Sequence, residues 1–273
     1  MKNQKYYFIS GLPRSGSTLL SSILKQNPKF TASISDPLHD YVRNILTTTH
    51  TSVGMEVAVP IEKRQELIKG LFKSFYQHGN EVCFNTNRAW TASTSLLKDL
   101  YPYTKIIVCV RDIPWILDSF EKLNADNAYS IKALYHHQDL STVYHRCASL
   151  MDTTNGYVAG PIMCLKQAVF STEQNMLCVV DYDALVKRPE DTMRKVYEFI
   201  DQDWYNHDFN NVEDSYDEFD EQTNIKGLHT IRRQVEYKPR KPVIPSDIWQ
   251  QNITQSFWKY DFDHIKKKIL WID

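Results

Sequence analysis

Short apolar runs alternate along the chain with longer segments in which apolar residues recur at helical spacing. The clearest run is Lys105–Val110, which is unbroken and rich in β-branched residues, as a strand buried on both faces of a parallel sheet should be. Comparable runs occur at Tyr6–Ile9, Glu81–Phe84 and Met176–Val180. This alternation predicts an α/β fold, with a three-layer parallel sheet flanked by helices.

The intervening segments predict helices and two loops. Thr51–Pro60 is polar and Asp201–Glu221 is dense in acidic residues, so both are expected to be loops. The polar, irregular stretch from Asn124 to Gly160 predicts a helical lid or an acceptor-binding insertion. Helices are expected at Leu19–Leu24, Leu38–Thr49, Ile61–His78, Leu96–Leu100, Leu140–Met151, Met163–Phe170 and Thr192–Ile200, with another starting at Pro114 and a terminal one after Val243.

The first strand leads into a small polar loop and then a helix. Gly11 and Gly16 have the spacing of a phosphate-binding loop, but Ser17 stands where a nucleotide-triphosphate loop has its lysine. The nearest cation is Arg14, inside the loop, whose planar guanidinium suits a terminal oxyanion. Unpaired N–H groups at the helix start favour an anion there. The stretch therefore predicts an anion cradle, with an ordinary strand-to-helix turn as the alternative.

A second anion element follows the strongest strand. Arg111 comes directly after it, and Ser119 lies eight positions later on the helix that Pro114 starts. A cation at a strand end and a hydroxyl on the next helix can converge on one phosphate. The alternative for Arg111 is an ion pair with Asp112 or another acid.

These two elements, in this order, resemble those of the sulfotransferases that use 3′-phosphoadenosine 5′-phosphosulfate (PAPS), in particular the tyrosylprotein and bacterial branches. GLPRSGSTLL resembles their 5′-phosphosulfate loop, VRDxxxxxxS their 3′-phosphate element, and VxDYDxLVxxPE the strand, loop and helix that follow it. A GLHxxR segment near the C-terminus is similar to one in bacterial members. The resemblance implies a P-loop sulfotransferase.

The resemblance also implies donor-binding residues, with PAPS as donor and 3′-phosphoadenosine 5′-phosphate (PAP) as product. The matched loop would hold the 5′-phosphosulfate, Arg111 and Ser119 the 3′-phosphate, and Tyr182 would lie near the adenine, unless its ring only packs at the sheet edge. The carried-over positions are Arg14, Ser15, Gly16, Ser17, Thr18, Arg111, Ser119, Tyr182, Gly227, Leu228, His229 and Arg232.

The resemblance implies the catalytic residues less directly than the donor-binding ones. Arg14 would stabilise the transferring group, and Arg88, after the second predicted strand, stands where the family often has a lysine or histidine; Arg88 as a helix-capping surface residue is the alternative. The tyrosylprotein branch takes its general base, a glutamate, from the loop after the first helix. Here Asp36 is the expected base and His39 the alternative, although Asp36 also suits the N-cap of the next helix.

Composition restricts the remaining classes. A net charge of −1 over 273 residues gives no electrostatic case for binding nucleic acid or a membrane as a whole. The N-terminus lacks a secretory apolar core and the chain lacks a bilayer-spanning run, so we expect a cytoplasmic protein without membrane insertion. Five scattered cysteines show no metal spacing, and no metal is expected. The length favours one domain over 1–273. Within it we expect the insertion at 124–160 and, around the GLHxxR segment, a cofactor-closing segment at 226–260.

Histidines in the insertion do not predict a metal site. His136 and His137 are adjacent and face different directions on any regular element, and His145 lacks a ligand at suitable spacing. Two other functions remain as alternatives to the sulfotransferase: a P-loop kinase or nucleotidase, and a catalytically inactive nucleotide-binding protein. The sequence leaves the hydroxyl-bearing acceptor and the oligomeric state open.

Overall fold

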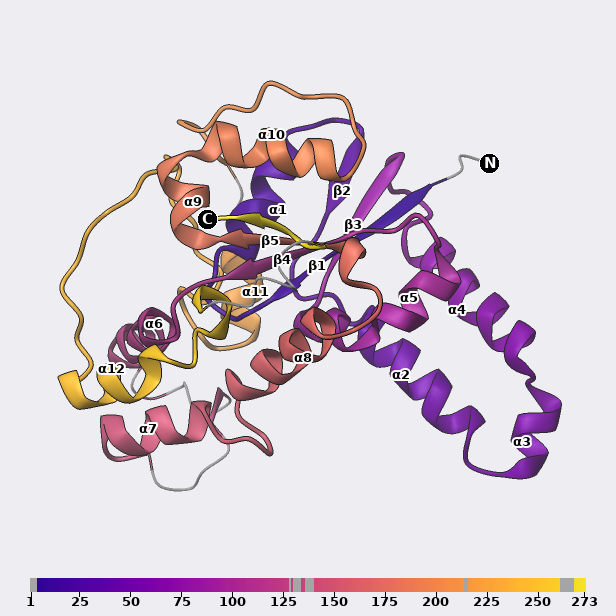
Figure 1. Cartoon of the computed structure of the whole chain (residues 1–273), viewed down its shortest axis with the longest axis horizontal. Coiled ribbons are helices and arrows are strands. Elements are labelled where there is room, and N and C mark those ends of the chain that lie inside the picture. Colours follow the sequence, from indigo (N-terminus) through magenta and orange to yellow (C-terminus); the bar gives the residue numbers. More distant parts are fainter. Residues whose placement is uncertain (1–3, 128, 130–133, 136–139, 214–215, 261–267) are drawn as a thin grey trace.

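Six parallel strands form one sheet in the order β2-β3-β1-β4-β5-β6, within the part of the chain that the computed structural model describes (residues 4–127, 129, 134–135, 140–213, 216–260 and 268–273) (Figure 1). The four predicted strands are confirmed as the centre of this sheet. Two edge strands of three residues each were not predicted. The strands are β1 (Lys5–Gly11), β2 (Phe30–Ala32), β3 (Val82–Thr86), β4 (Ile106–Val110), β5 (Leu177–Asp181) and β6 (Leu270–Ile272).

Helices cover both faces of the sheet, which confirms the three-layer prediction (Figure 1). One face carries α1 (Ser17–Lys25), α9 (Tyr182–Lys187) and α10 (Pro189–Phe199). The other carries most of the remaining helices. These are α2 (Leu38–Thr49), α4 (Ile61–Phe75), η1 (Arg88–Ser93), α5 (Thr94–Leu100), α6 (Ile113–Asp126), α7 (Val143–Leu150), α8 (Ala159–Val169), η3 (Gln174–Met176), α12 (Ser246–Ile253) and η4 (Phe257–Lys259).

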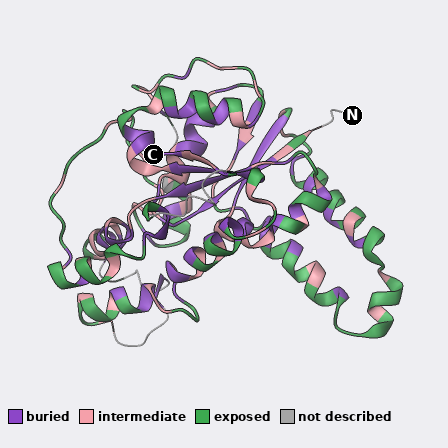
Figure 2. Cartoon of the chain, viewed as in Figure 1, coloured by how far each residue is buried: buried purple, intermediate pink, exposed green. Residues whose placement is uncertain are grey.

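Side chains alternate between the two cores along every central strand. In β1, Phe8 packs into the core under α4 and α6, whereas Tyr7 and Ile9 pack into the core under α1 and α10. Ile106 and Ile107 of β4 divide in the same way. The central strands β1, β3, β4 and β5 are buried along most of their length (Figure 2), which is why they appear in the sequence as apolar runs.

Two predicted loops contain helices. Thr51–Pro60 includes α3 (Val53–Ala58), whose N-cap Ser52 accepts a hydrogen bond from the backbone N–H of Met55 at 3.2 Å. The acidic stretch includes α11 (Asp217–Gln222). A solvated-loop prediction fails there because one carboxylate faces inward, as described below. Helices α2 to α4 project from the sheet and are largely exposed (Figure 2).

The predicted insertion contains α7, between the end of α6 and the start of α8. Arg146 of α7 forms an ion pair with Glu121 of α6, which fixes the two helices to each other. His136 and His137 lie outside the described residues. Among the described residues, no helix has the length and apolar character needed to cross a membrane.

Gly11 ends β1 at a point where no side chain fits. Its φ is +110°, and a Cβ on this residue would lie 2.1 Å from the carbonyl oxygen of Cys109 in β4. The hydrogen bond from the N–H of Leu12 to that same oxygen, 2.9 Å long, turns the chain into the loop before α1. The loop therefore starts from a backbone position that depends on glycine.

Substituting Gly11→Ala should destabilise the protein by at least about 2 kcal/mol, because both the dihedral angle and the contact with β4 become unfavourable. Gly70→Ala is the matched control, since Gly70 lies inside α4 with nothing within 4 Å of an added Cβ. It should stabilise the helix by up to about 1 kcal/mol. Urea denaturation measures both variants, and equal free energies of unfolding for them would contradict this account of Gly11.

Candidate active site

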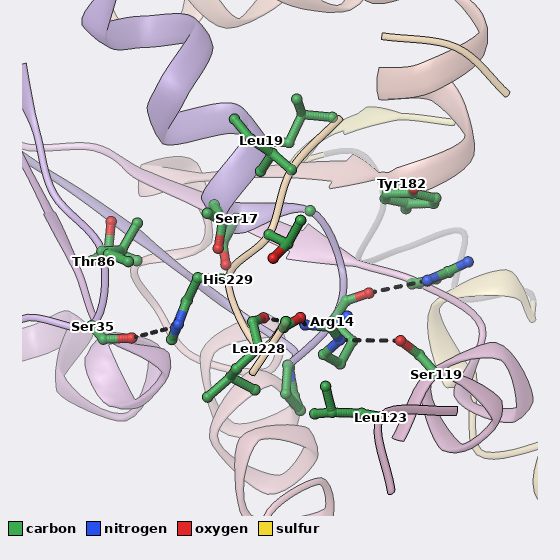
Figure 3. A pocket seen from close by; sticks show the side chains of 18 of the residues that line it. Arg14, Ser17, Leu19, Ser35, Thr86, Ser119, Leu123, Tyr182, Leu228 and His229 are labelled. Atoms are coloured by element: carbon green, nitrogen blue, oxygen red, sulfur yellow. Dashed lines mark hydrogen bonds between the residues drawn. The ribbon is translucent and has the colours of Figure 1, made fainter. Parts of the chain in front are cut away.

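A cavity of about 650 Å³ opens beyond the carboxyl ends of β1, β3 and β4. Its walls come from the loop before α1, the loop before α2, the starts of η1 and α9, and the segment 227–240. Ligands of open parallel sheets bind at this edge. Figure 3 shows side chains of several of these segments around Arg14, among them Ser35, Tyr182 and His229.

The loop between β1 and α1 contributes both backbone and side chains to the cavity. Arg14 and Gly16 have φ values of 56° and 93°, so successive N–H groups curve toward the start of α1. Ser15 turns its hydroxyl inward, where it donates to the carbonyls of Leu12 and Cys109. Ser17 and Thr18 line the cavity. An anion at this position would meet the positive end of the helix.

Arg14 joins three segments of the chain. Its Nε donates to the Ser119 hydroxyl at 3.0 Å, and its Nη1 donates to the carbonyl of Leu228 and, at 3.4 Å, to that of Gly227 (Figure 3). Burial lowers the pKa of this guanidinium, and the charge of Arg111 lowers it further. The loop and the segment after α11 therefore share one cation.

Arg111 lies beside Arg14 in the same cavity. Its Nη1 donates to the Arg14 carbonyl at 3.3 Å, and its guanidinium packs over the ring of Tyr182 at 4.2 Å. The Nε atom is buried and has no hydrogen-bond partner among the described residues. Asp112 pairs with Lys259 at 2.6 Å, so the alternative of an Arg111–Asp112 ion pair is wrong. A buried guanidinium N–H without a partner suits an anionic ligand.

Gly16 and Tyr182 are in close contact. A Cβ on Gly16 would lie 2.9 Å from the Tyr182 ring, which Arg111 covers on one side. The glycine therefore allows the start of α9 to approach the loop, and the ring lines the cavity between the two anion elements. This packing brings Tyr182 to the site even without any ligand.

Asp36 lines the cavity from the loop before α2, away from Arg111 and Tyr182, and is only 6% exposed. Its Oδ2 accepts hydrogen bonds from the Ser33 hydroxyl, from the Tyr76 hydroxyl at 3.2 Å and from the N–H of Thr86 at 3.1 Å. Burial raises the pKa of Asp36, and these three bonds oppose the rise. Among the described residues no group donates to Oδ1, which leaves that oxygen for the cavity.

The alternative base, His39, does not line the cavity. It is 3% exposed and packs edge-on against Trp90, with ring centroids 4.8 Å apart. Arg88 does line it: the side chain packs over Tyr157, with its Cζ 4.1 Å from the ring centroid, and its Nη2 donates to the Tyr157 hydroxyl at 2.5 Å. The insertion thus supplies Tyr157 to hold Arg88 in place.

His229 faces the cavity from the segment after α11 (Figure 3). Its Nδ1 lies 2.7 Å from a carboxylate oxygen of Asp220, and its Nε2 lies 3.2 Å from the Ser35 hydroxyl. Asp220 is 2% exposed and also accepts the backbone N–H of His229 at 2.9 Å. The histidine ring is therefore fixed at both nitrogens.

Comparison with known families gives the site its context. The model of a family described as "Sulfotransferase family" matches residues 7–206, which is more than half of the chain. This chain belongs to the sulfotransferase family. The family match supports transferase activity for the chain.

Solved structures of sulfotransferases resemble this sulfotransferase over most of its length. The sulfotransferase domain from the curacin biosynthetic pathway is 13% identical, with 98% of this chain and 96% of that one covered and a TM-score of 0.47. The domain of the Synechococcus PCC 7002 olefin synthase is 17% identical, with coverage of 96% and 97% and a TM-score of 0.44. STF9 of Mycobacterium avium is 12% identical, with coverage of 95% and 78% and a TM-score of 0.47. No curated protein sequence gives a significant match.

The cavity brings together nearly all residues named from the sequence. Ser15 and His39 are not among the residues that line it. The residues that line the cavity are Arg14, Gly16, Ser17, Thr18, Asp36, Arg88, Arg111, Ser119, Tyr182, Gly227, Leu228, His229 and Arg232. Among the described residues, no group of three or more His, Cys, Asp or Glu side chains is arranged to hold a metal ion.

The residues that sequence reasoning missed include Tyr157 and Arg240, which line the cavity, and Asp220, which lies behind His229. Arg240 lines the cavity and forms an ion pair with the fully buried Asp118 of α6. For Asp220 a signal existed, because Tyr216 and Phe219 precede it at helical spacing within the acidic stretch. For Tyr157 and Arg240 the sequence shows no pattern that would place them here.

Replacing Asp36→Asn should destabilise the protein by about 1–3 kcal/mol, because the carboxylate oxygen that accepts three hydrogen bonds loses its charge. Asp40→Asn is the control: Asp40 also lines the cavity, but its side chain is 73% exposed, so the change should stay within about 0.5 kcal/mol. Thermal and urea unfolding compare the two. If Asp36→Asn were as stable as the control, the hydrogen bonds would not be holding this end of the cavity.

Proposed function

We propose that this sulfotransferase transfers a sulfuryl group from PAPS to an acceptor hydroxyl or amine, by general-base-assisted in-line displacement without a metal. The observation that carries the proposal is the pair of guanidinium groups in one cavity, Arg14 and Arg111, neither of which has an acidic ion-pair partner among the described residues. A ligand with an anionic group at each end would satisfy both. PAPS carries a phosphosulfate at the 5′ end and a phosphate at the 3′ position.

Each end of the donor has a suitable group of residues. The backbone of Ser15–Thr18 and the Arg14 side chain would hold the 5′-phosphosulfate at the start of α1. Arg111 and Ser119 would hold the 3′-phosphate, with the free Nε–H of Arg111 as one donor. Tyr182 would lie near the adenine. Gly227, Leu228, His229 and Arg232 would close over the donor, and PAP would be the product.

Burial supports this assignment energetically. Burial lowers the pKa values of both Arg14 and Arg111, because it removes the guanidinium groups from water. The positive charge of Arg111 lowers the pKa of Arg14 further. A bound dianion reverses these effects. The buried positive charge is unfavourable in the free protein, and this cost is relieved when the negatively charged donor binds.

The transfer step needs positive charge and N–H groups around the sulfuryl oxygens, an aligned acceptor and a proton acceptor. A sulfuryl group has less charge than a phosphoryl group, which reduces the need for a metal. Arg14 and Arg88 would stabilise the transferring group. Asp36 and His229 are the two groups at the acceptor end of the cavity that can take the proton.

Arg14→Ala should lower turnover by roughly 100-fold and leave the fold intact, because it removes one donor to the developing charge. The assay supplies PAPS with a library of alcohols, phenols, sugars and amines and detects the mass of one added sulfuryl group. Arg194→Ala is the control, since Arg194 pairs with Glu190 on the exposed side of α10 and does not line the cavity. Wild-type turnover by Arg14→Ala would refute the proposed role.

Arg111→Ala should weaken PAP binding by about 10–100-fold, equivalent to one lost charge-assisted contact. Binding of AMP, which lacks the 3′-phosphate, should change little, so the variant should lose the preference for PAP over AMP. Calorimetry measures both ligands, with ATP and Mg²⁺ as a third. Equal losses for PAP and AMP would contradict the 3′-phosphate assignment, and tighter binding of ATP than of PAP by the wild type would favour the kinase alternative.

A further inference from the structure

The His229 ring is held by a carboxylate from its own segment. Asp220 belongs to α11, is 2% exposed and accepts two hydrogen bonds from His229, one from the backbone N–H at 2.9 Å and one at Nδ1 at 2.7 Å. Two contacts to one carboxylate fix both the position and the rotation of the ring. Phe219 packs edge-on against it, with ring centroids 4.9 Å apart.

This arrangement determines which nitrogen carries the proton of the neutral ring. A carboxylate only accepts hydrogen bonds, so Nδ1 must be the N–H that faces Asp220. Nε2 then has a free lone pair, and it is this atom that points into the cavity toward the Ser35 hydroxyl, 3.2 Å away (Figure 3). Ser35 itself is exposed and has a φ of 50°. Its hydroxyl shows that an O–H group fits against Nε2.

Burial lowers the pKa of His229 and thereby favours a neutral ring. Asp220 raises this pKa, and the guanidinium groups of Arg14 and Arg88 lower it again. Tyr216 and Phe219, the other neighbours of the ring, are aromatic. The ring can thus accept a proton at neutral pH, with Asp220 placed to stabilise the cation that results.

Asp36, the base expected from the sequence, is differently placed. Its Oδ2 is occupied by Ser33, Tyr76 and Thr86, which tie together the ends of α4 and β3. Burial raises the pKa of Asp36 and these three hydrogen bonds oppose the rise, but all three engage Oδ2, so this oxygen is already committed to the surrounding structure. Its position suits holding the loop that carries Ser35.

We propose that His229 accepts the proton of the acceptor hydroxyl during sulfuryl transfer, and that Asp220 is the residue that positions it. The proposal rests on the proposed function and adds the base to it. The acceptor oxygen would take the place of the Ser35 hydroxyl against Nε2. As its O–H proton passes to Nε2, the oxygen forms a bond to sulfur, the bond from sulfur to the 5′-phosphate oxygen breaks, and that electron pair leaves with PAP.

The reverse reaction tests this role without the native acceptor. With PAP and an aryl sulfate, the wild type would form PAPS and a phenol, and protonated His229 would deliver the proton to the leaving oxygen. His229→Gln should lose at least about 100-fold in kcat/KM with phenyl sulfate, whose leaving group needs that proton. It should lose far less with p-nitrophenyl sulfate, whose leaving group does not. An equal loss with both sulfates would mean a structural role and would overturn the proposal.

Asp220→Asn tests the positioning role. An asparagine amide favours the tautomer with the proton on Nε2, so turnover should fall by about 100-fold or more although His229 is still present. Nitrogen NMR of the histidine rings reads the tautomer directly and needs no substrate. In the wild type at neutral pH, Nδ1 of His229 should be protonated and Nε2 bare, with the reverse in Asp220→Asn. A wild-type ring protonated at Nε2 or at both nitrogens would overturn the proposal.

Two controls separate this proposal from the donor assignment. Because His229 also belongs to the segment proposed to close over the donor, PAP binding by calorimetry is measured in His229→Gln, and a loss of turnover at least about 10-fold larger than the loss of PAP affinity points to the proton transfer. If the wild type itself failed to bind PAP, the proposed function would fail, and the NMR result would still report on the His229–Asp220 pair. His78→Gln, an exposed histidine outside the cavity, should behave as wild type in every assay.

Discussion

The arrangement of the site depends on two arginines that share one cavity without an acidic partner among the described residues. Proteins usually place a carboxylate beside a half-buried guanidinium, because an unpaired charge away from water is unfavourable. Here carbonyl groups of the segment after α11, a serine hydroxyl and the face of Tyr182 take that place. These neutral groups position the two side chains without forming an ion pair with either, and the cavity keeps its attraction for an anion.

The sheet makes this concentration of charge possible. Parallel strands bring their carboxyl ends to one edge, so residues far apart in sequence, such as Arg14, Arg88 and Arg111, reach a common space directly from strand ends. Gly11 lets β1 lie against β4 closely enough for the loop to emerge between them. The segment 227–240 adds the remaining wall, and the ion pair between Arg240 and Asp118 anchors this segment to α6.

The sequence predicted the central strands and most helices because their burial leaves a direct record: an unbroken apolar run for β4, and helical spacing for α4 and α10. It missed β2 and β6, each of three residues, because such runs are too short to have a period. Most of the cavity-lining residues named from the sequence belong to local motifs, which is why the sequence could point to them. Asp220 was missed because an acidic stretch normally indicates solvent exposure, and the helical spacing of Tyr216 and Phe219 was the only local sign of burial before the contact with His229 was known.

The N-cap of helix α1 is Gly16, which has no side chain to accept the first N–H groups of the helix. Most helices begin with a serine, threonine, aspartate or asparagine that performs this function, a contribution of about 1 kcal/mol. In this sulfotransferase an oxyanion of the substrate can serve as the missing cap. Occupancy of the cavity should then complete a secondary-structure element as well as a binding site, and the resistance of the first helix to fraying becomes a measure of how full the cavity is.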